Sequence, residues 1–207
     1  MGVNFSYLLY FKRDQLWDAL QGVVEMAEKR DPPVVIHFPD HKLNIPLGTL
    51  FDEERSYQYD DPEFDFATIL KFDDDDAISD WIYADYRMVE SVDRSPPGPE
   101  QDTRVGIGYI YLKVHNDLSD LFPHNLPDDL VLFDFGTTGS KMSMLFDYST
   151  SMRKAFVELL DRYNGVCGVF NRENGGDLFW LRGRHLDERI KDAFTLPGEL
   201  EKKYGLE

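Results

Sequence analysis

The stretch YLLYFKRDQLWDALQGVV, residues 7–24, indicates an apolar strand that runs directly into an amphipathic helix. The unbroken apolar run over residues 7–11 is typical of a buried strand, and the charges that follow end it. Asp14 is of the type that caps the N-terminus of a helix. The apolar residues after it recur at helical spacing and give the helix one apolar face. The sequence therefore predicts a strand followed by a helix that packs on the same sheet.

A similar pattern recurs later in the chain. Residues 143–160, SMLFDYSTSMRKAFVELL, align with residues 7–24 without a gap, so an apolar strand that runs into a helix is expected here as well. The helix-face positions are Leu16, Leu20, Val23, Val24 and Ala27 in the first copy, and Met152, Phe156, Leu159, Leu160 and Tyr163 in the second. A weaker middle copy begins at Ala67, and two strand patterns follow each helix. The sequence therefore predicts an α+β fold with a mainly antiparallel or mixed sheet, built from about three strand-helix-strand-strand units with helices on one face.

The predicted organisation is a single compact domain over residues 1–207, with pseudo-repeats at 4–50, 67–138 and 143–184. Residues 186–207 are expected to form a polar C-terminal tail with a short helix near residues 199–203. Two acidic or proline-rich stretches, 50–66 and 90–104, are expected to be connectors. The alternative, that so loose a periodicity arose by chance, stays open.

Composition limits the kinds of partner. The formal net charge of −17 disfavours nucleic acid and anionic lipid, and it would attract a basic protein. The apolar run near the N-terminus is too short for a signal peptide or a membrane span, so a cytoplasmic location is expected. Cys167 is the single cysteine and is expected to be a buried strand thiol. No cofactor is expected.

The string FDFGTTGSKMSMLF, residues 133–146, resembles the first phosphate loop of the superfamily of actin, sugar kinases and ATP-driven heat-shock chaperones. The matching positions are Asp134, Gly136, Thr137, Thr138 and Ser140. The resemblance implies a hairpin whose backbone amides receive phosphate. The second phosphate loop and the adenosine motif of that superfamily are not visible downstream. A Gly-Thr turn that joins two strands is therefore the favoured interpretation.

Two groups of residues resemble metal ligands. The run Asp73 to Asp76 supplies oxygen atoms, but its spacing is not that of a calcium loop, and acids also favour the start of a helix. His37 and His41 flank a predicted hairpin turn that contains Asp40. We interpret the acids as a solvated helix start and the histidines as surface residues, and we expect no metal site.

Aromatic and arginine side chains suggest one ligand site. Strand alternation places Trp180, Arg182 and Arg184 on one face of a strand, and Tyr109 and Tyr111 on one face of another. If these strands are neighbours, the five residues surround one anionic or aromatic ligand. The competing interpretation is that the rings belong to the core and that the arginines pair with the chain's own acids.

We expect a binding or protein-interaction module rather than an enzyme, with a small molecule or a basic protein as its partner. Two alternatives stay open. One is a metal-dependent or phosphoester-directed hydrolase that uses the aspartates or the Gly-Thr-Thr string. The other is an acidic, immunity-like inhibitor of a basic protein, which the net charge suggests.

Overall fold

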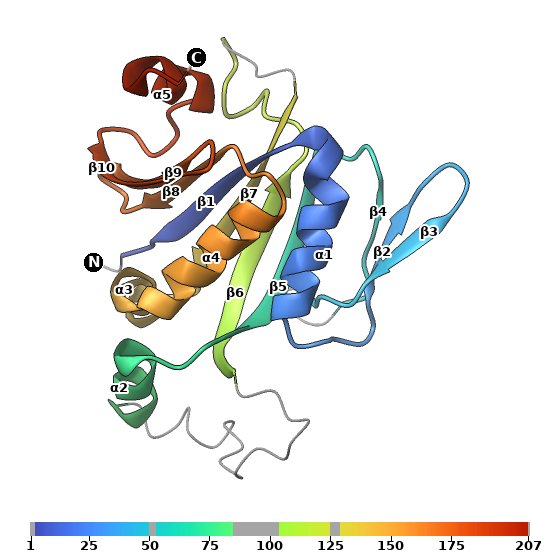
Figure 1. Ribbon diagram of the computed structural model, residues 1–207. Coiled ribbons are helices and arrows are strands. Elements are labelled where there is room, and N and C mark those ends of the chain that lie inside the picture. The colour runs from blue at the N-terminus through green and yellow to red at the C-terminus, as the bar shows by residue number, and fades with distance from the viewer. Residues whose placement is uncertain (1–2, 50–52, 85–103, 125–128, 207) are drawn as a thin grey trace.

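The computed structural model describes residues 3–49, 53–84, 104–124 and 129–206 (Figure 1). Within them the chain forms ten strands and five α-helices. The strands are β1 (Ser6–Lys12), β2 (Val34–His37), β3 (Lys42–Ile45), β4 (Ser56–Gln58), β5 (Glu63–Phe72), β6 (Val105–His115), β7 (Leu130–Thr137), β8 (Cys167–Asn171), β9 (Gly176–Leu181) and β10 (Arg184–Ile190). The helices are α1 (Leu16–Met26), α2 (Asp76–Ala84), α3 (Ser140–Tyr148), α4 (Thr150–Arg162) and α5 (Pro197–Tyr204), and a 3-10 turn, Arg13–Gln15, precedes α1.

Seven strands form one antiparallel sheet in the order β10-β9-β8-β1-β7-β6-β5. The apolar strand β1 lies at its centre and pairs with β7 and β8. A smaller sheet has the order β3-β2-β4, in which β2 and β4 are parallel. The predicted α+β class with a mainly antiparallel sheet is therefore confirmed.

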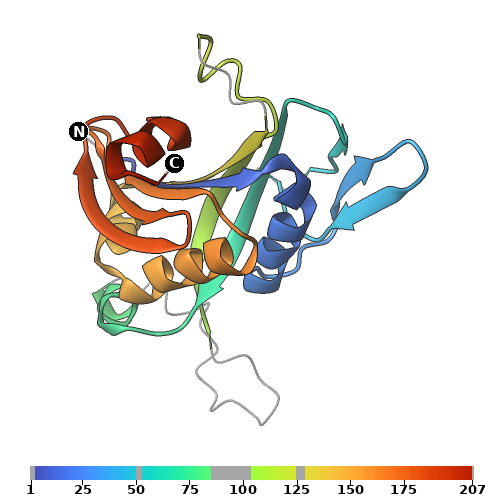
Figure 2. The same ribbon diagram turned by 45° about the horizontal axis from the view of Figure 1, so that its top comes forward.

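Both faces of the central strand are buried. Tyr7 and Leu9 belong to the helix-side core, together with residues of α1 and α4. Leu8 and Tyr10 face the opposite way and pack with residues that include Leu200 of α5. Figure 2 shows α4 and α5 on different sides of the large sheet. The helices are thus not confined to one face, because an uninterrupted apolar strand needs cover on both sides.

The two long helices approach each other closely on the helix-side face. A Cβ atom at Gly22 of α1 would lie 2.3 Å from Cε2 of Tyr163, at the end of α4. A side chain at position 22 would therefore force Tyr163 and Leu159 to move. Near it, Arg162 donates to the Glu25 carboxylate at 2.5 Å and so links the two helices.

The third predicted unit begins differently from the other two. The first two segments run β1-α1-β2-β3 and β5-α2-β6-β7, whereas the third runs α3-α4-β8-β9. The prediction of a strand at residues 143–148 is wrong, because these residues lie in α3. Its buried residues Met142, Leu145 and Phe146 follow helical spacing, and methionine and leucine favour helices over strands. The repeat itself stays a prediction.

The predicted C-terminal tail contains the strand β10 before the predicted short helix, which is α5. A two-residue turn joins β9 to β10, with positive φ at both Arg182 (48°) and Gly183 (79°). Such turns match the twist of antiparallel strands, and glycine is their usual signal. The first predicted connector, residues 50–66, includes β4 and the start of β5, and all of the second except Arg104 lies outside the described residues.

No helix in the described ranges combines the length and the apolar character that a membrane span requires.

Candidate functional site

The five residues predicted to surround a ligand do not come together. Tyr109 and Tyr111 lie on β6 and Trp180 lies on β9, and the strands β7, β1 and β8 separate them. At about 4.8 Å between neighbouring strands, this separation is roughly 19 Å. The two tyrosines alternate with Ile110 and Leu112, which share the helix-side core with Trp180. The tyrosines therefore face the opposite side of the sheet.

Trp180 and Arg182 have the roles that the competing interpretation gives them, a ring in the core and an arginine paired with an acid of the chain. Trp180 is 3% exposed and its Nε1 donates to the Gly165 carbonyl oxygen at 3.3 Å. Arg182 donates from Nε to Oε1 of Glu201 in α5 at 2.6 Å. Arg184 is exposed at the start of β10.

A different pair of arginines shares one aromatic ring. Arg153 of α4 places its guanidinium carbon 5.6 Å from the centre of the Phe170 ring, and Arg172 lies 5.0 Å from the same centre. The Arg153 guanidinium also lies over Tyr7 at 5.9 Å and over Phe179 at 5.1 Å. The face of an aromatic ring attracts a cation, so three rings hold Arg153 in place.

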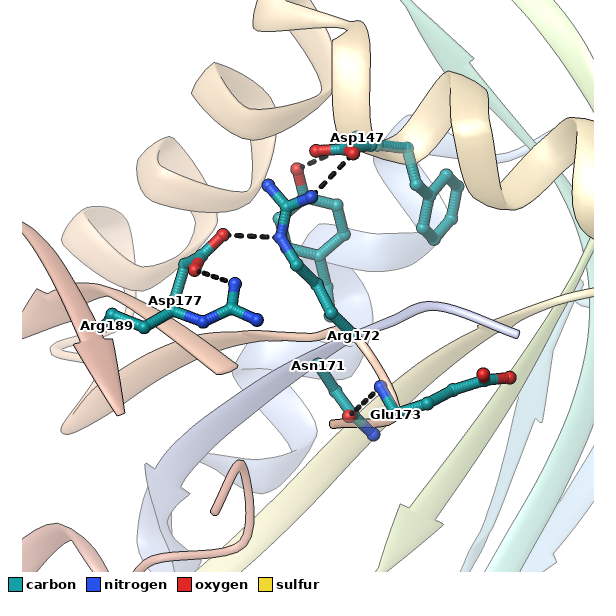
Figure 3. A network of polar contacts seen from close by, with 8 residues as sticks. Asp147, Asn171, Arg172, Glu173, Asp177 and Arg189 are labelled. Atoms are coloured by element: carbon teal, nitrogen blue, oxygen red, sulfur yellow. Dashed lines mark hydrogen bonds and ion pairs between the residues drawn. The ribbon is translucent and has the colours of Figure 1, made fainter. Parts of the chain in front are cut away.

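Two carboxylates hold Arg172 (Figure 3). Its Nη1 donates to Asp147 at 2.6 Å and its Nε donates to Asp177 at 2.7 Å. The second carboxylate oxygen of Asp177 accepts from Arg189, also at 2.7 Å. Partial burial raises the pKa of Asp177, but hydrogen bonds from the two arginines outweigh that effect and hold the pKa below its usual range. Asp177 is therefore ionised at neutral pH.

Arg153 has no such partner. Among the described residues, no carboxylate lies within ion-pair distance of its guanidinium. Its guanidinium lies over the Tyr7 ring, and the Tyr7 hydroxyl donates to the Phe146 carbonyl oxygen at 3.0 Å. Burial raises the pKa of Tyr7 to about 12 despite the nearby arginine, so Tyr7 is neutral. This cluster, defined as Arg153, Arg172, Arg189, Asp147 and Asp177, thus has three positive and two negative charges, a surplus of one positive charge.

Arg153 lines a cavity of about 520 Å³, which we call the Arg153 cavity. One wall is α4, through Thr150, Arg153, Lys154 and Val157, which follow the spacing of a single helix face. The remaining lining residues are Arg172, Asp177, Phe179, His185, Leu186 and Asp187. A register irregularity between His185 and Glu188 lies in the β10 wall. Bulges of this kind redirect side chains, and they are common beside functional sites.

A second cavity, of about 250 Å³, lies on the other side of α4, between α4 and α1. Its charged residues largely pair within the chain. Arg162 binds Glu25, and Arg104 donates to the Glu25 carbonyl oxygen at 3.2 Å. The Arg153 cavity is therefore the stronger candidate, because among the described residues no carboxylate lies within ion-pair distance of the Arg153 guanidinium.

Arg153 and Arg172 were not predicted as site residues, because α4 and the end of β8 bring them together from segments that are separate in the sequence. One signal was present in the sequence. Arg153 lies directly after Met152 and three residues before Phe156, which places it at the border of the apolar face of α4. An arginine at that border extends along the core and presents its charge at the edge.

Asp75 connects two helix N-termini. One carboxylate oxygen accepts from the Ser149 hydroxyl at 2.8 Å and from the Ser151 amide at 2.9 Å, where α4 begins. The other accepts from the Ile78 amide at 2.9 Å, at the start of α2. Partial burial raises the pKa of Asp75, but these hydrogen bonds outweigh it and hold the pKa below its usual value. The aspartate run is therefore more than a solvated helix start, since Asp75 joins α2 to α4.

We expect Asp75→Asn to lower the free energy of unfolding by about 1–3 kcal/mol at pH 7, because it removes a charged acceptor from four donors, the weakest of which is Thr150 Oγ1 at 3.4 Å. The folded-state pKa lies below the unfolded value of 3.8, so this stabilisation is present above pH 3.8 and is lost as the pH falls through the folded-state pKa. Urea unfolding at pH 7 and at pH 3 measures the change. Asp73→Asn is the matched control, since Asp73 is exposed. An equal loss of unfolding free energy in Asp75→Asn and Asp73→Asn would contradict the role of Asp75 in joining α2 to α4.

The string that resembles a phosphate loop does not form the predicted hairpin. β7 ends at Thr137 and α3 begins at Ser140, so the segment is a strand, a turn and a helix. Methionine and leucine after the turn favour a helix over the expected strand. The turn's polar groups bind the chain's own N-terminal segment: Ser143 Oγ donates to the Val3 carbonyl oxygen and accepts from the Phe5 amide, and Ser140 Oγ accepts from the Val3 amide.

The predicted hairpin around residues 39–42 is confirmed as β2 and β3. Within it, Nδ1 of His41 lies 2.8 Å from Oδ1 of Asp40, and the His41 ring stacks on Phe38 with ring centres 4.4 Å apart. Within the described residues, no group of three or more histidine, cysteine or acidic residues is placed to hold a metal ion.

Comparison of the chain with protein-family models, with curated proteins and with solved structures finds no match.

Proposed function

We propose that this chain is a binding module whose Arg153 cavity takes a ligand with one anionic group and an apolar part. The observation that carries the proposal is the Arg153 guanidinium, which lines the cavity and has no carboxylate partner among the described residues. A surplus positive charge in a chain of net charge −17 favours an anion at this place, although the overall charge repels anions. One carboxylate would balance the cluster.

The surroundings of Arg153 favour binding in two further ways. Tyr7, Phe170 and Phe179 already hold the guanidinium, so little side-chain freedom is lost when a ligand binds. The apolar side chains of Val157, Phe179 and Leu186 line the same cavity. Ligand sites commonly combine apolar walls with a few fixed polar groups, and 520 Å³ is within their usual size.

The hydrolase and the acidic inhibitor stay untested predictions. Neither has a specific supporting observation among the described residues, since the aspartate run is used in part to join helices and Thr137 of the Gly-Thr-Thr string donates to the Phe5 carbonyl oxygen.

Calorimetric titration with 4-methylvalerate and with isoamyl phosphate tests the proposal, and 4-methylvaleramide is the neutral control ligand. We expect an anion to bind and the amide to bind at least about tenfold more weakly, because an ionic hydrogen bond is lost. Arg153→Gln should remove the difference between anion and amide. Arg184→Gln removes an exposed arginine outside the cavity lining and should leave the difference unchanged.

The proposal is wrong if neither anion binds, or if the two variants weaken binding equally. Thermal unfolding of each variant provides the folding control, because Arg153 also contacts the core rings.

A further inference from the structure

The Arg153 cavity is bounded on one side by an edge strand. In the described sheet β10 pairs with β9 alone. No other backbone group in the described ranges forms a hydrogen bond with residues 184–190. The outer side of β10 therefore presents backbone N–H and C=O groups that an added strand can pair with.

The helix α4 faces this edge across the cavity. Arg153 and Val157 form part of one wall, and Leu186 and Asp187 form part of the other. A groove between a helix and an edge strand receives an extended peptide well, because the strand supplies main-chain hydrogen bonds and the groove accepts alternate side chains. The irregularity between His185 and Glu188 limits regular pairing to a few residues.

The charges around the groove indicate which peptide fits. Among the described residues, Arg153 has no carboxylate within ion-pair distance. Asp187 and Glu188 are exposed on β10, and neither forms an ion pair within the described part of the chain. The groove therefore combines one unpaired cation inside the cavity with two unpaired acids at residues 187 and 188, while the exposed Arg184 lies at the start of the strand. This arrangement suits a peptide with a terminal carboxylate and with basic side chains beside residues 187 and 188.

We infer that the ligand is the C-terminal end of an extended peptide, which adds to the outer edge of β10 and places its terminal carboxylate on Arg153. The last side chain is apolar and lies against Val157, Phe179 and Leu186, and basic residues upstream lie near Asp187 and Glu188. This inference rests on the proposed function, since it names the ligand of the same cavity.

Affinity selection from two hexapeptide libraries tests the inference. Both libraries are N-acetylated and randomised at the first five positions, and their last residue is valine, leucine, isoleucine or phenylalanine. One library has a free C-terminal carboxylate, and the other has a C-terminal amide. We expect the immobilised full chain to retain carboxylate peptides enriched in lysine and arginine. The corresponding amides should bind at least about tenfold more weakly. Arg153→Gln should abolish the retention, whereas Lys202→Gln, on the exposed surface of α5, should not.

Hydrogen exchange on the strongest synthetic peptide provides the second measurement. Pairing of the peptide with the edge of β10 should slow amide exchange in residues 184–190. Two sets of alternate peptide nitrogens can be N-methylated, and methylation of the set that faces β10 should weaken binding.

The outcomes separate the inference from the proposed function. If 4-methylvalerate or isoamyl phosphate binds at Arg153 but neither library is retained, the peptide inference is wrong and the proposed function stands. Equal retention of carboxylates and amides, or binding that leaves exchange in residues 184–190 unchanged, also overturns the peptide inference. If neither the libraries nor the small anions bind, both are wrong.

Discussion

Phe156→Ala is expected to lower the free energy of unfolding by about 3–5 kcal/mol. Phe156 is fully buried on α4, and its ring centre lies 4.4 Å from that of Tyr7 and 4.8 Å from that of Phe135. Removal of the ring leaves a cavity between the helix and the two central strands, which closely packed neighbours fill only in part.

Urea unfolding at pH 7 measures this change. Glu158→Ala is the control on the same helix, because Glu158 is exposed and forms only an i,i+4 pair with Lys154. The control should lose less than about 0.5 kcal/mol. A loss below about 1 kcal/mol in Phe156→Ala would contradict the packing of α4 against the sheet.

Asp134→Asn is expected to stabilise the protein at pH 8 by about 3 kcal/mol. Burial on β7 raises the pKa of Asp134 from 3.8 to about 6, and the opposing effects of a Ser6 hydrogen bond and of Lys113 are smaller. One carboxylate oxygen, Oδ1, has no hydrogen-bond partner. A shift of about 2 units corresponds to about 3 kcal/mol.

The direction of this pH dependence follows from the pKa of Asp134 in the folded and in the unfolded state. The folded state holds its proton up to about pH 6, whereas the unfolded state releases it near pH 3.8. The Asp134 contribution to stability therefore declines as the pH rises through this window and stays low above it. Asparagine resembles the neutral acid, so the advantage of Asp134→Asn should appear between pH 4 and pH 7 and then level off.

Urea unfolding of both proteins across pH 4–8 measures the difference. Asp65→Asn is the matched control, because Asp65 neighbours the same Lys113 and its side chain is 47% exposed. A difference between wild type and Asp134→Asn that does not vary with pH would show that Asp134 does not titrate in this window.

The spacing of apolar residues in the sequence predicts those helices that have one apolar face and one polar face. The helix-face residues Leu16, Leu20, Met152 and Phe156 are all buried, as their spacing indicates. The prediction failed at residues 143–148, where the run SMLFDY suits either a buried strand or a short helix. β-Branched residues favour a strand over a helix, and this run contains none. Their absence was the signal that this segment is a helix.

The strand order could not be predicted, and the ligand site depended on it. The predicted site required β6 and β9 to be neighbours, but β1 pairs with β7 and β8 and lies between them. Alternation within one strand fixes which residues share a face, but it does not identify the neighbouring strands. For the same reason the meeting of Arg153 and Arg172 over Phe170 was not visible in the sequence.

The central claim is that Arg153 holds an anion, and the side-chain Nε–Hε signals of the arginines test it most directly. Arg153→Gln identifies the Arg153 signal by its loss in a nitrogen–proton correlation spectrum. We expect 4-methylvalerate or isoamyl phosphate to shift that signal saturably, while the signals of Arg172 and Arg184 shift little. An Arg153 signal that stays unchanged at saturating anion, or that shifts no more than the exposed Arg184 signal, would contradict the account.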